Sequence, residues 1–402
     1  MIMGQQRKAL IIGCGIAGPA LALFLQRAGI TSEIYEARTK LDGYSLTLSS
    51  NGVAVLQELG LDAAAFAEGA AVTRFRMWNG RGKSLGGGVL AGAGLKSVFI
   101  KRVPLGEIMT RAAEQQGIAI FRGKKLRDIK TTSQDGVIAS FEDGSSASGD
   151  FLVGCDGVHS RTRQLLYPDF PAARYTGLIN SGGYTANMPL DTEPETMHFI
   201  AGKRAFFGYQ ISNNGYTYWF TNQPRPAEPV RGEFDNIDPA EQKQALLDLY
   251  QDDQPIIRQI IQNAESIFPY FLSYALPKQP ESWHQGPVVL LGDAVHAIAP
   301  SSGQGASMAL EDAGILAKCL RDIPQLEQAF STFEQLRRAR TRKMYQAGQQ
   351  GDSGKHATTA GQQWFRDLTT PFFLKLFANA KAADWMYSYR VNWDQPLSSH
   401  LP

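Results

Sequence analysis

Three groups of glycine and polar residues in this chain have types and spacings that suit chemistry. The first is the run Gly13-Cys14-Gly15-Ile16-Ala17-Gly18, with Glu36 further along the chain. Its glycines allow a tight turn and the close approach of a pyrophosphate to a helix N-terminus, where free N–H groups favour negative charge. Glu36 is placed to accept hydrogen bonds from an adenosine ribose, and its carboxylate would repel a 2′-phosphate. The motif therefore predicts a tightly held dinucleotide other than NADP.

Two more motifs follow, "GCDGVHSRTR" over residues 154–163 and "GDAVHAIAPSSGQGASMALEDA" over residues 292–313. We expect Asp293 to come just after a buried strand, at the carboxyl edge where open α/β sheets bind ligands. A carboxylate at that edge suits the hydroxyls of a polyol chain. Gly303 and Gly305 let backbone N–H groups at the start of the next helix approach a flat ring.

Periodicity predicts the elements that position the first motif. Residues 9–12 form a short apolar run, typical of a parallel strand buried on both faces. Apolar residues then recur with helical spacing from Ala17 to Ala28, and Gly29 is a plausible stop. The run "SEIYEA" supplies a second strand that ends near Glu36, completing a βαβ unit.

Later segments predict a second helix and then a set of aromatic-rich strands. An amphipathic helix is expected from about Leu105 to Gly117, and Asp135-Gly136 and Asp143-Gly144 predict hairpin turns. Residues 177–223 read as aromatic-rich strands with a turn at Asn213-Asn214-Gly215, after which the chain returns to a buried strand at "GPVVLLGDA". The predicted fold is α/β, a discontinuous Rossmann-like domain with an inserted β-sheet domain and a helical C-terminal tail. The predicted boundaries are 1–176 and 284–345 for its two parts, 177–283 for the insertion and 346–402 for the tail.

Composition narrows the classes of function. The chain has 402 residues, 43% of them hydrophobic and 19% charged, which is typical of a globular protein. A net charge of +2 gives no reason to expect a nucleic-acid or membrane partner. Cys14, Cys155 and Cys319 form no C-x-x-C pair, so neither a metal site nor a disulfide framework is predicted. With no room for a signal peptide and no apolar run near the roughly 20 residues of a membrane span, we expect a cytoplasmic monomer or homodimer.

Together the three motifs resemble those of the class A flavoprotein monooxygenases, the para-hydroxybenzoate hydroxylase-like family. The resemblance covers residues 8–345 and has one visible departure, Ser307, where the family usually carries asparagine. The family's DG motif is matched by Asp156, Gly157, Ser160 and Arg163, and its GD motif by Gly292, Asp293, His296, Pro300, Gly303, Gln304 and Gly305. A family arginine that precedes a helix is matched by Arg102.

The resemblance implies that the dinucleotide is FAD, bound tightly but not covalently. The implied FAD-binding residues are Gly13, Gly15, Ile16, Ala17, Gly18, Glu36, Ala37, Arg38, Arg102, Leu126, Asp156, Asp293, Pro300, Gly303, Gly305 and Ala306. It also implies that NAD(P)H binds transiently and reduces FAD, and that dioxygen then forms a flavin C4a-hydroperoxide. That species would hydroxylate a small aromatic or polycyclic substrate with no catalytic side chain, because the cofactor carries the hard chemistry.

Strand alternation guides the prediction of a substrate pocket. Phe207 and Tyr209 share one face of their strand, and Tyr218 lies on the partner strand. We predict that Phe207, Tyr209 and Tyr218 line the pocket, because the inserted sheet is the part not assigned to FAD. Which face of the sheet covers the pocket stays open at this stage.

Other polar residues have plainer interpretations. We expect His296 to be a packed or ribose-adjacent histidine rather than a proton-transfer group. The basic run at Arg337, Arg338, Arg340, Arg342 and Lys343 is interpreted as a solvated helix face rather than a nucleic-acid site.

Three other classes of flavoprotein compete with the hydroxylase interpretation. A flavin-dependent halogenase would carry a W-x-W-x-I-P signature, which none of the six tryptophans here fits. A flavin reductase or oxidase would insert no oxygen into its substrate. A non-catalytic flavoprotein that sequesters a small molecule receives slight support from Ser307, whereas the intact DG motif counts against it.

Overall fold

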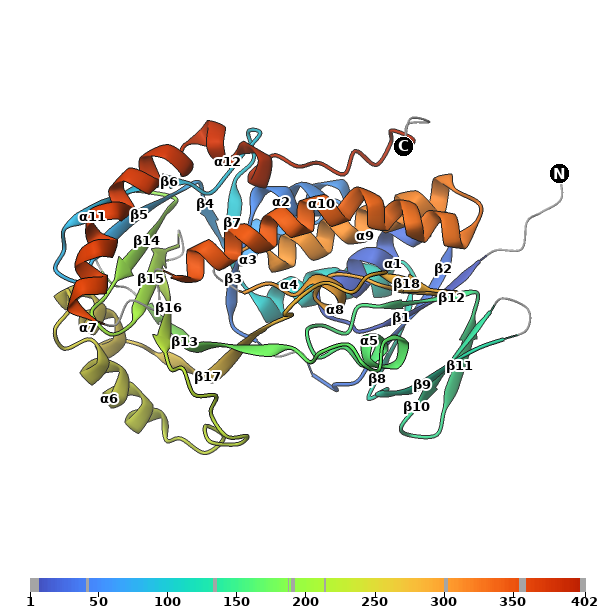
Figure 1. Ribbon diagram of the computed structural model, residues 1–402, viewed down its shortest axis with the longest axis horizontal. Helices are drawn as coiled ribbons and strands as arrows, with labels where there is room; N and C mark the ends of the chain where they lie inside the picture. Colours follow the sequence, from blue (N-terminus) through green and yellow to red (C-terminus); the bar gives the residue numbers. More distant parts are fainter. Residues whose placement is uncertain are drawn as a thin grey trace.

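The computed structural model describes residues 7–40, 43–132, 136–186, 188, 192–212, 215–299, 303–353 and 359–397. Two large sheets lie at opposite ends of an elongated molecule, with the long strands β13 (Arg174–Ala186) and β17 (Ser266–Ala275) running between them (Figure 1). This arrangement confirms the predicted α/β class, with a parallel sheet, a second antiparallel sheet and C-terminal helices.

The first sheet has six strands and is parallel except at its β18 edge. Its order is β18 (His284–Gln285), β19 (Val288–Leu290), β12 (Phe151–Gly154), β1 (Lys8–Ile12), β2 (Thr31–Glu36) and β8 (Ala119–Arg122). Ala9 and Ile11 pack into the main helical core, whereas Leu10 and Ile12 pack on the opposite face. The predicted strand buried on both faces is therefore confirmed.

Helices cover one face of this sheet and a small antiparallel sheet covers the other. The helical layer contains α1 (Ala17–Arg27), α4 (Arg102–Gln115), α9 (Gly305–Asp322) and α10 (Leu326–Ser353). The opposite layer contains β9 (Leu126–Thr131), β10 (Val137–Phe141) and β11 (Ser146–Gly149). The predicted turn at Asp143-Gly144 joins β10 to β11, with Gly144 at a φ of +85°, whereas Asp135, Asn213 and Asn214 of the other predicted turns lie outside the described residues.

Short elements connect the layers and carry parts of the motifs. They are β3 (Ser45–Leu48), α2 (Ser50–Glu58), α3 (Asp62–Glu68), β4 (Ala70–Val72), β7 (Ser97–Lys101), α5 (Arg161–Leu166) and α8 (Asp293–His296). Strands β3, β7 and β4 form a three-stranded sheet, and α2 packs on α9.

The second large sheet has seven strands in the order β17-β13-β16-β15-β14-β5-β6. Besides β13 and β17 it contains β14 (Thr196–Ala201), β15 (Phe206–Ile211), β16 (Tyr216–Pro224), β5 (Arg74–Asn79) and β6 (Ser84–Val89), and helices α6 (Pro239–Leu249) and α7 (Pro255–Gln262) pack on one face. Strands β5 and β6 come from the first segment, well before the predicted insertion at residue 177. They join through parallel pairing of β5 with β14, a long-range contact that local sequence patterns do not record.

The C-terminal region is helical, as predicted. Helix α10 runs through the predicted boundary at residue 346, and α11 (Ala360–Phe377) and α12 (Ala380–Tyr387) follow. Helix α11 packs along β6 at the outer end of the second sheet (Figure 1). Within the described part of the chain, no helix is long and apolar enough to cross a membrane.

Candidate active site

The glycine-rich turn between β1 and α1 has the geometry that its sequence predicts. Gly13 has a φ of +108°, and a Cβ there would lie 2.5 Å from the carbonyl oxygen of Cys155. A Cβ on Gly18 would lie 2.0 Å from the carbonyl oxygen of Gly13, so both positions require glycine. Helix α1 begins at Ala17 with no side-chain cap, which leaves its first N–H groups available to a phosphate.

Glu36 lies at the end of β2, as predicted, and faces this turn. Its Oε2 accepts the Cys14 N–H at 2.7 Å, and its Oε1 accepts the Arg38 N–H at 2.8 Å. The carboxylate therefore joins the glycine turn to the segment that contains Ala37 and Arg38. By contrast, the Leu126 side chain is buried in the core on the far face of the sheet, so only its backbone is left for a cofactor.

Arg102 and Asp293 approach the same turn from distant parts of the chain. The Arg102 N–H at the start of α4 donates to the Tyr44 carbonyl at 2.9 Å, and a Cβ built on Gly15 would lie 4.0 Å from the Arg102 Nη2 atom. Asp293 is the first residue of α8, shortly after β19, and it is exposed to solvent at one side while protein atoms surround the other. Desolvation by the surrounding protein raises the pKa of Asp293, and the nearby His296 and Arg102 side chains oppose the shift.

The DG turn supplies an acceptor and a structural link. The Asp156 Oδ2 atom accepts both the N–H and the hydroxyl of Thr162 at 2.9 Å, while Oδ1 is buried with no partner among the described residues. Burial raises the pKa of this carboxyl group. The Arg163 guanidinium donates to the carbonyls of Ala294 and Val158, each at 2.7 Å, and so holds the DG turn against α8.

The N-terminus of α9 is open to a ligand. Gly303 has a φ of +63° with open space where a Cβ would stand, and a Cβ on Gly305 would lie 3.8 Å from Asp293 Oδ1. Helix α9 has no side-chain cap, and Ala306 lies in its first turn. Ser307, the departure from the family pattern, is buried and accepts the Ser49 N–H at 3.1 Å, so its hydroxyl holds the start of α2. The predicted Pro300 lies outside the described residues.

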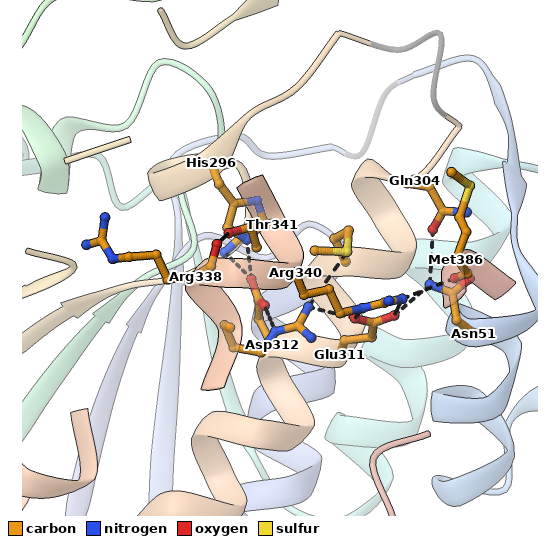
Figure 2. A network of polar contacts seen from close by, with 12 residues as sticks. Asn51, His296, Gln304, Glu311, Asp312, Arg338, Arg340, Thr341 and Met386 are labelled. Carbon is orange, nitrogen blue, oxygen red and sulfur yellow. Dashed lines mark hydrogen bonds and ion pairs between the residues drawn. The ribbon is translucent and has the colours of Figure 1, made fainter. Parts of the chain in front are cut away.

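A buried network of charges lies directly behind this helix start (Figure 2). On α9, Asp312 accepts from His296 Nε2 and from Arg337 Nε, the latter at 2.6 Å, while Glu311 pairs with Arg337 and Arg340, each at 2.7 Å. The amide of Asn51 on α2 donates to Glu311 at 2.6 Å. The network links α2, α8, α9 and α10 to one another.

This network corrects the interpretation of the basic run on α10 as a solvated face. Arg337 has no exposed side-chain surface and Arg340 only 11%. Arg338 is also largely buried and pairs with Glu334, whereas Arg342 and Lys343 are exposed as expected. The adjacent carboxylates Glu311 and Asp312, inside an apolar helix, were the signal in the sequence, because buried acids require partners. His296 is a packed histidine, as expected.

The three cysteines are free thiols, and burial raises the pKa of each of them. Cys14 and Cys155 are therefore packed side chains beside the motif glycines rather than reactive thiols.

The pairing of β15 with β16 contradicts the prediction that Phe207, Tyr209 and Tyr218 line one pocket. Tyr209 pairs with Trp219, and Gln210 pairs with Tyr218, so the two tyrosines lie on opposite faces of the sheet. Phe207 and Tyr209 belong to the core formed with α6 and α7. Because Tyr218 is one residue away from Trp219, the partner of Tyr209, its side chain points to the other face of the sheet.

The face that carries Tyr218 looks toward the FAD-binding half. The Tyr218 ring is 5.9 Å from the ring of Phe99 on β7, measured between centroids. The Lys101 Nζ atom is 4.0 Å from the ring centroid of Tyr184 and 5.6 Å from that of Tyr218. Sequence reasoning missed Lys101 and Tyr184. Alternation along β7 places Phe99 and Lys101 on one face, but the sheet opposite them was not predictable.

A glycine-rich βαβ turn, a second turn at Asp293 and the uncapped start of α9 form a site that suits FAD. The residues present fit the cofactor, because two uncapped helix starts, the open space at Gly303 and the Asp156 oxygen without a partner among the described residues all lie within the three motifs. Residues 6–347 match the family described as "FAD binding domain", and the chain belongs to that family.

Curated relatives agree with this assignment, and a solved structure has the same fold. Aurachin C monooxygenase/isomerase of Stigmatella aurantiaca is 29% identical over 82% of this chain and 84% of its own length. FAD-dependent urate hydroxylase of Klebsiella oxytoca is 26% identical over 90% of this chain and 94% of its own length. In fold, the chain is similar to Klebsiella pneumoniae HpxO complexed with FAD and uric acid, with a TM-score of 0.82 and 24% identity over 92% of this chain and 94% of that one.

Proposed function

We propose that this protein uses NAD(P)H and dioxygen to hydroxylate a small aromatic or polycyclic organic substrate. The observation that carries the proposal is the convergence of the glycine turn, Arg102 and Asp293 opposite the face that carries Tyr184 and Tyr218. Bound FAD would supply hydride acceptance, oxygen activation and oxygen transfer, which no protein side chain here can supply.

Residues beside the first sheet would hold and orient the cofactor. The uncapped start of α1 would bind the pyrophosphate, and Glu36 would accept from the adenosine ribose. Asp293 would accept hydroxyls of the ribityl chain, while Arg102 would contribute positive charge beside it. The start of α9 favours negative charge on the ring by about 0.3–1 kcal/mol, through its free N–H groups and helix dipole.

The residues of the second sheet hold the substrate and exclude water. Tyr184 and Tyr218 offer ring faces for an aromatic substrate, and Lys101 offers a cation above those rings. Relatives of this chain include urate hydroxylase, 3-amino-4-hydroxybenzoate 2-monooxygenase and 6-hydroxynicotinate 3-monooxygenase, all of which act on small rings. NAD(P)H binds transiently, since the sequence has no second glycine-rich dinucleotide motif.

The test separates the hydroxylase from its alternatives in two stages. Under anaerobic conditions, NADH or NADPH should bleach the absorbance of bound FAD, which a non-catalytic binder would not allow. In air, a panel of phenols, hydroxylated heterocycles and quinolones should include a compound that accelerates NAD(P)H oxidation and gains one oxygen atom from ¹⁸O₂. Rapid NAD(P)H oxidation with no labelled product from any compound would favour the reductase or oxidase instead.

A further inference from the structure

The most unusual surface in this structure is the outer face of α11. Of the exposed large hydrophobic side chains in the described residues, all but Phe121 and Val230 lie on this helix. They are Trp364, Phe365, Leu368, Phe372, Phe373, Leu376 and Phe377, with exposed fractions from 47% to 67%. No residue of α11 is buried.

Specific polar contacts hold the helix with this face outward. The Arg366 Nη2 atom donates to the Ala201 carbonyl at 3.1 Å, and the Asn79 Nδ2 atom donates to Asp367 Oδ2 at 2.8 Å. A capping box between Thr359 and Gln362 fixes the first turn. The helix therefore turns Arg366 and Asp367 toward the protein and its largest apolar side chains toward solvent, the reverse of an ordinary surface helix.

The exposed apolar surface is too large to be incidental. A large aromatic side chain offers about 150–250 Å², so seven large side chains exposed by about half or more present roughly 800 Å². The largest apolar patch on a typical monomer is about 300–600 Å². Trp364, Leu368, Phe372 and Leu376 form one row, and Phe373 and Phe377 lie farther round, so apolar surface wraps more than half of the helix.

Four exposed cations border this surface. Lys375 lies on α11 and Lys381 in the first turn of α12, both exposed. Arg81 and Lys83 lie in the exposed β5–β6 turn, where their N–H groups donate to Asn79 Oδ1, each at 3.0 Å. Asn79 also binds α11, so this turn lies against the helix. Among the described residues, none of these four cations has an ion pair.

We propose that α11 docks the protein onto an anionic phospholipid bilayer, lying in its surface rather than crossing it. Trp, Phe and Leu on a helix bordered by cations fit the boundary between acyl chains and anionic headgroups. Lipid chains can surround more than half of a helix, whereas a single flat protein partner cannot. A second copy of the chain is a less favourable partner, because pairing two α11 helices would place their cations against one another. The expectation of no membrane partner rested on the net charge of the whole chain, which averages out this local surface.

The test is co-sedimentation of the FAD-loaded protein with vesicles of phosphatidylcholine, with and without phosphatidylserine. The protein should sediment with the anionic vesicles and be released by salt, because the headgroup attraction is screened. Trp364→Gln combined with Phe372→Gln should weaken partition at least tenfold. Lys375→Glu combined with Lys381→Glu should do the same for anionic vesicles. Val230→Gln, which removes an exposed apolar side chain away from α11, should leave partition unchanged.

Three results would overturn the proposal. They are a protein that stays in the supernatant with both vesicle types, partition that survives both double variants, and a dimer in light scattering that Trp364→Gln with Phe372→Gln dissociates. The last result would assign the surface to a second copy. FAD absorbance and NAD(P)H oxidation in solution should be unchanged in every variant, which shows that the variants fold.

Discussion

Replacing Arg337 by methionine tests whether the buried charge network holds the helical layer together. Arg337 has no exposed surface, and its guanidinium lies 2.7 Å from Glu311 and 2.6 Å from Asp312. Removing one partner of a buried ion pair typically costs about 3–5 kcal/mol, because a charge is left without compensation. Here Glu311 keeps Arg340, and Asp312 keeps His296, so we expect the lower end, about 3 kcal/mol.

The assay is urea unfolding of wild type and variant at neutral pH and saturating FAD, followed by circular dichroism. Arg342→Met is the matched control, since Arg342 lies on the same helix but is exposed and has no ion pair among the described residues. We expect the control to change the free energy of unfolding by no more than about 0.5 kcal/mol. If Arg337→Met costs no more than Arg342→Met, the network contributes nothing and the reasoning is refuted.

Three further predictions concern the site. Asp293→Ala and Arg102→Ala should each weaken FAD affinity about ten- to a hundredfold in a fluorescence titration of the apoprotein, and unchanged affinity in both would mean that the flavin lies elsewhere. Tyr218→Ala should raise hydrogen peroxide released per NAD(P)H oxidised, whereas Tyr209→Ala should lower the melting temperature and leave that ratio unchanged; the opposite pattern would reverse the assignment of faces. Desolvation raises the pKa of Asp312, but ion pairing with His296 and Arg337 outweighs it and lowers the pKa from 3.8 to about 2. The stability that the Asp312 carboxylate gives the fold is therefore complete above pH 3.8 and is lost as the pH falls toward 2. Asp312→Asn should remove this pH dependence from acid-unfolding curves.

Local patterns predicted the cofactor half of the molecule well. The turn from Gly13 to Gly18 demands glycine for local reasons, because Gly13 has a φ of +108° and its carbonyl fills the space of a side chain at Gly18. The strand that ends at Glu36 and the helix that begins at Arg102 are likewise visible as short periodic runs. Each of these features depends mainly on neighbours along the chain, so a single sequence suffices to find it.

The substrate side depended on information that a single sequence does not carry. Alternation tells which residues of one strand share a face, but it does not tell which residue of the next strand lies opposite. Here Tyr209 faces Trp219 across the ladder, and this register sends Tyr209 toward α6 and α7. The addition of β5 and β6 to the sheet was hidden for the same reason, because β5 pairs with a strand more than 100 residues later.

The charge network shows how the cofactor motif and the C-terminal helices depend on each other. Glu311 and Asp312 lie on α9, only two turns after Gly305, and both carboxylates are fully buried. Buried acids at that distance from the ring would oppose a negative charge on a ligand unless cations neutralised them. Arg337 and Arg340 on α10 supply that positive charge, and Asn51 carries the contact on to α2. The start of α9 can therefore present free N–H groups to an anionic ring, because α10 has already balanced the acids behind it.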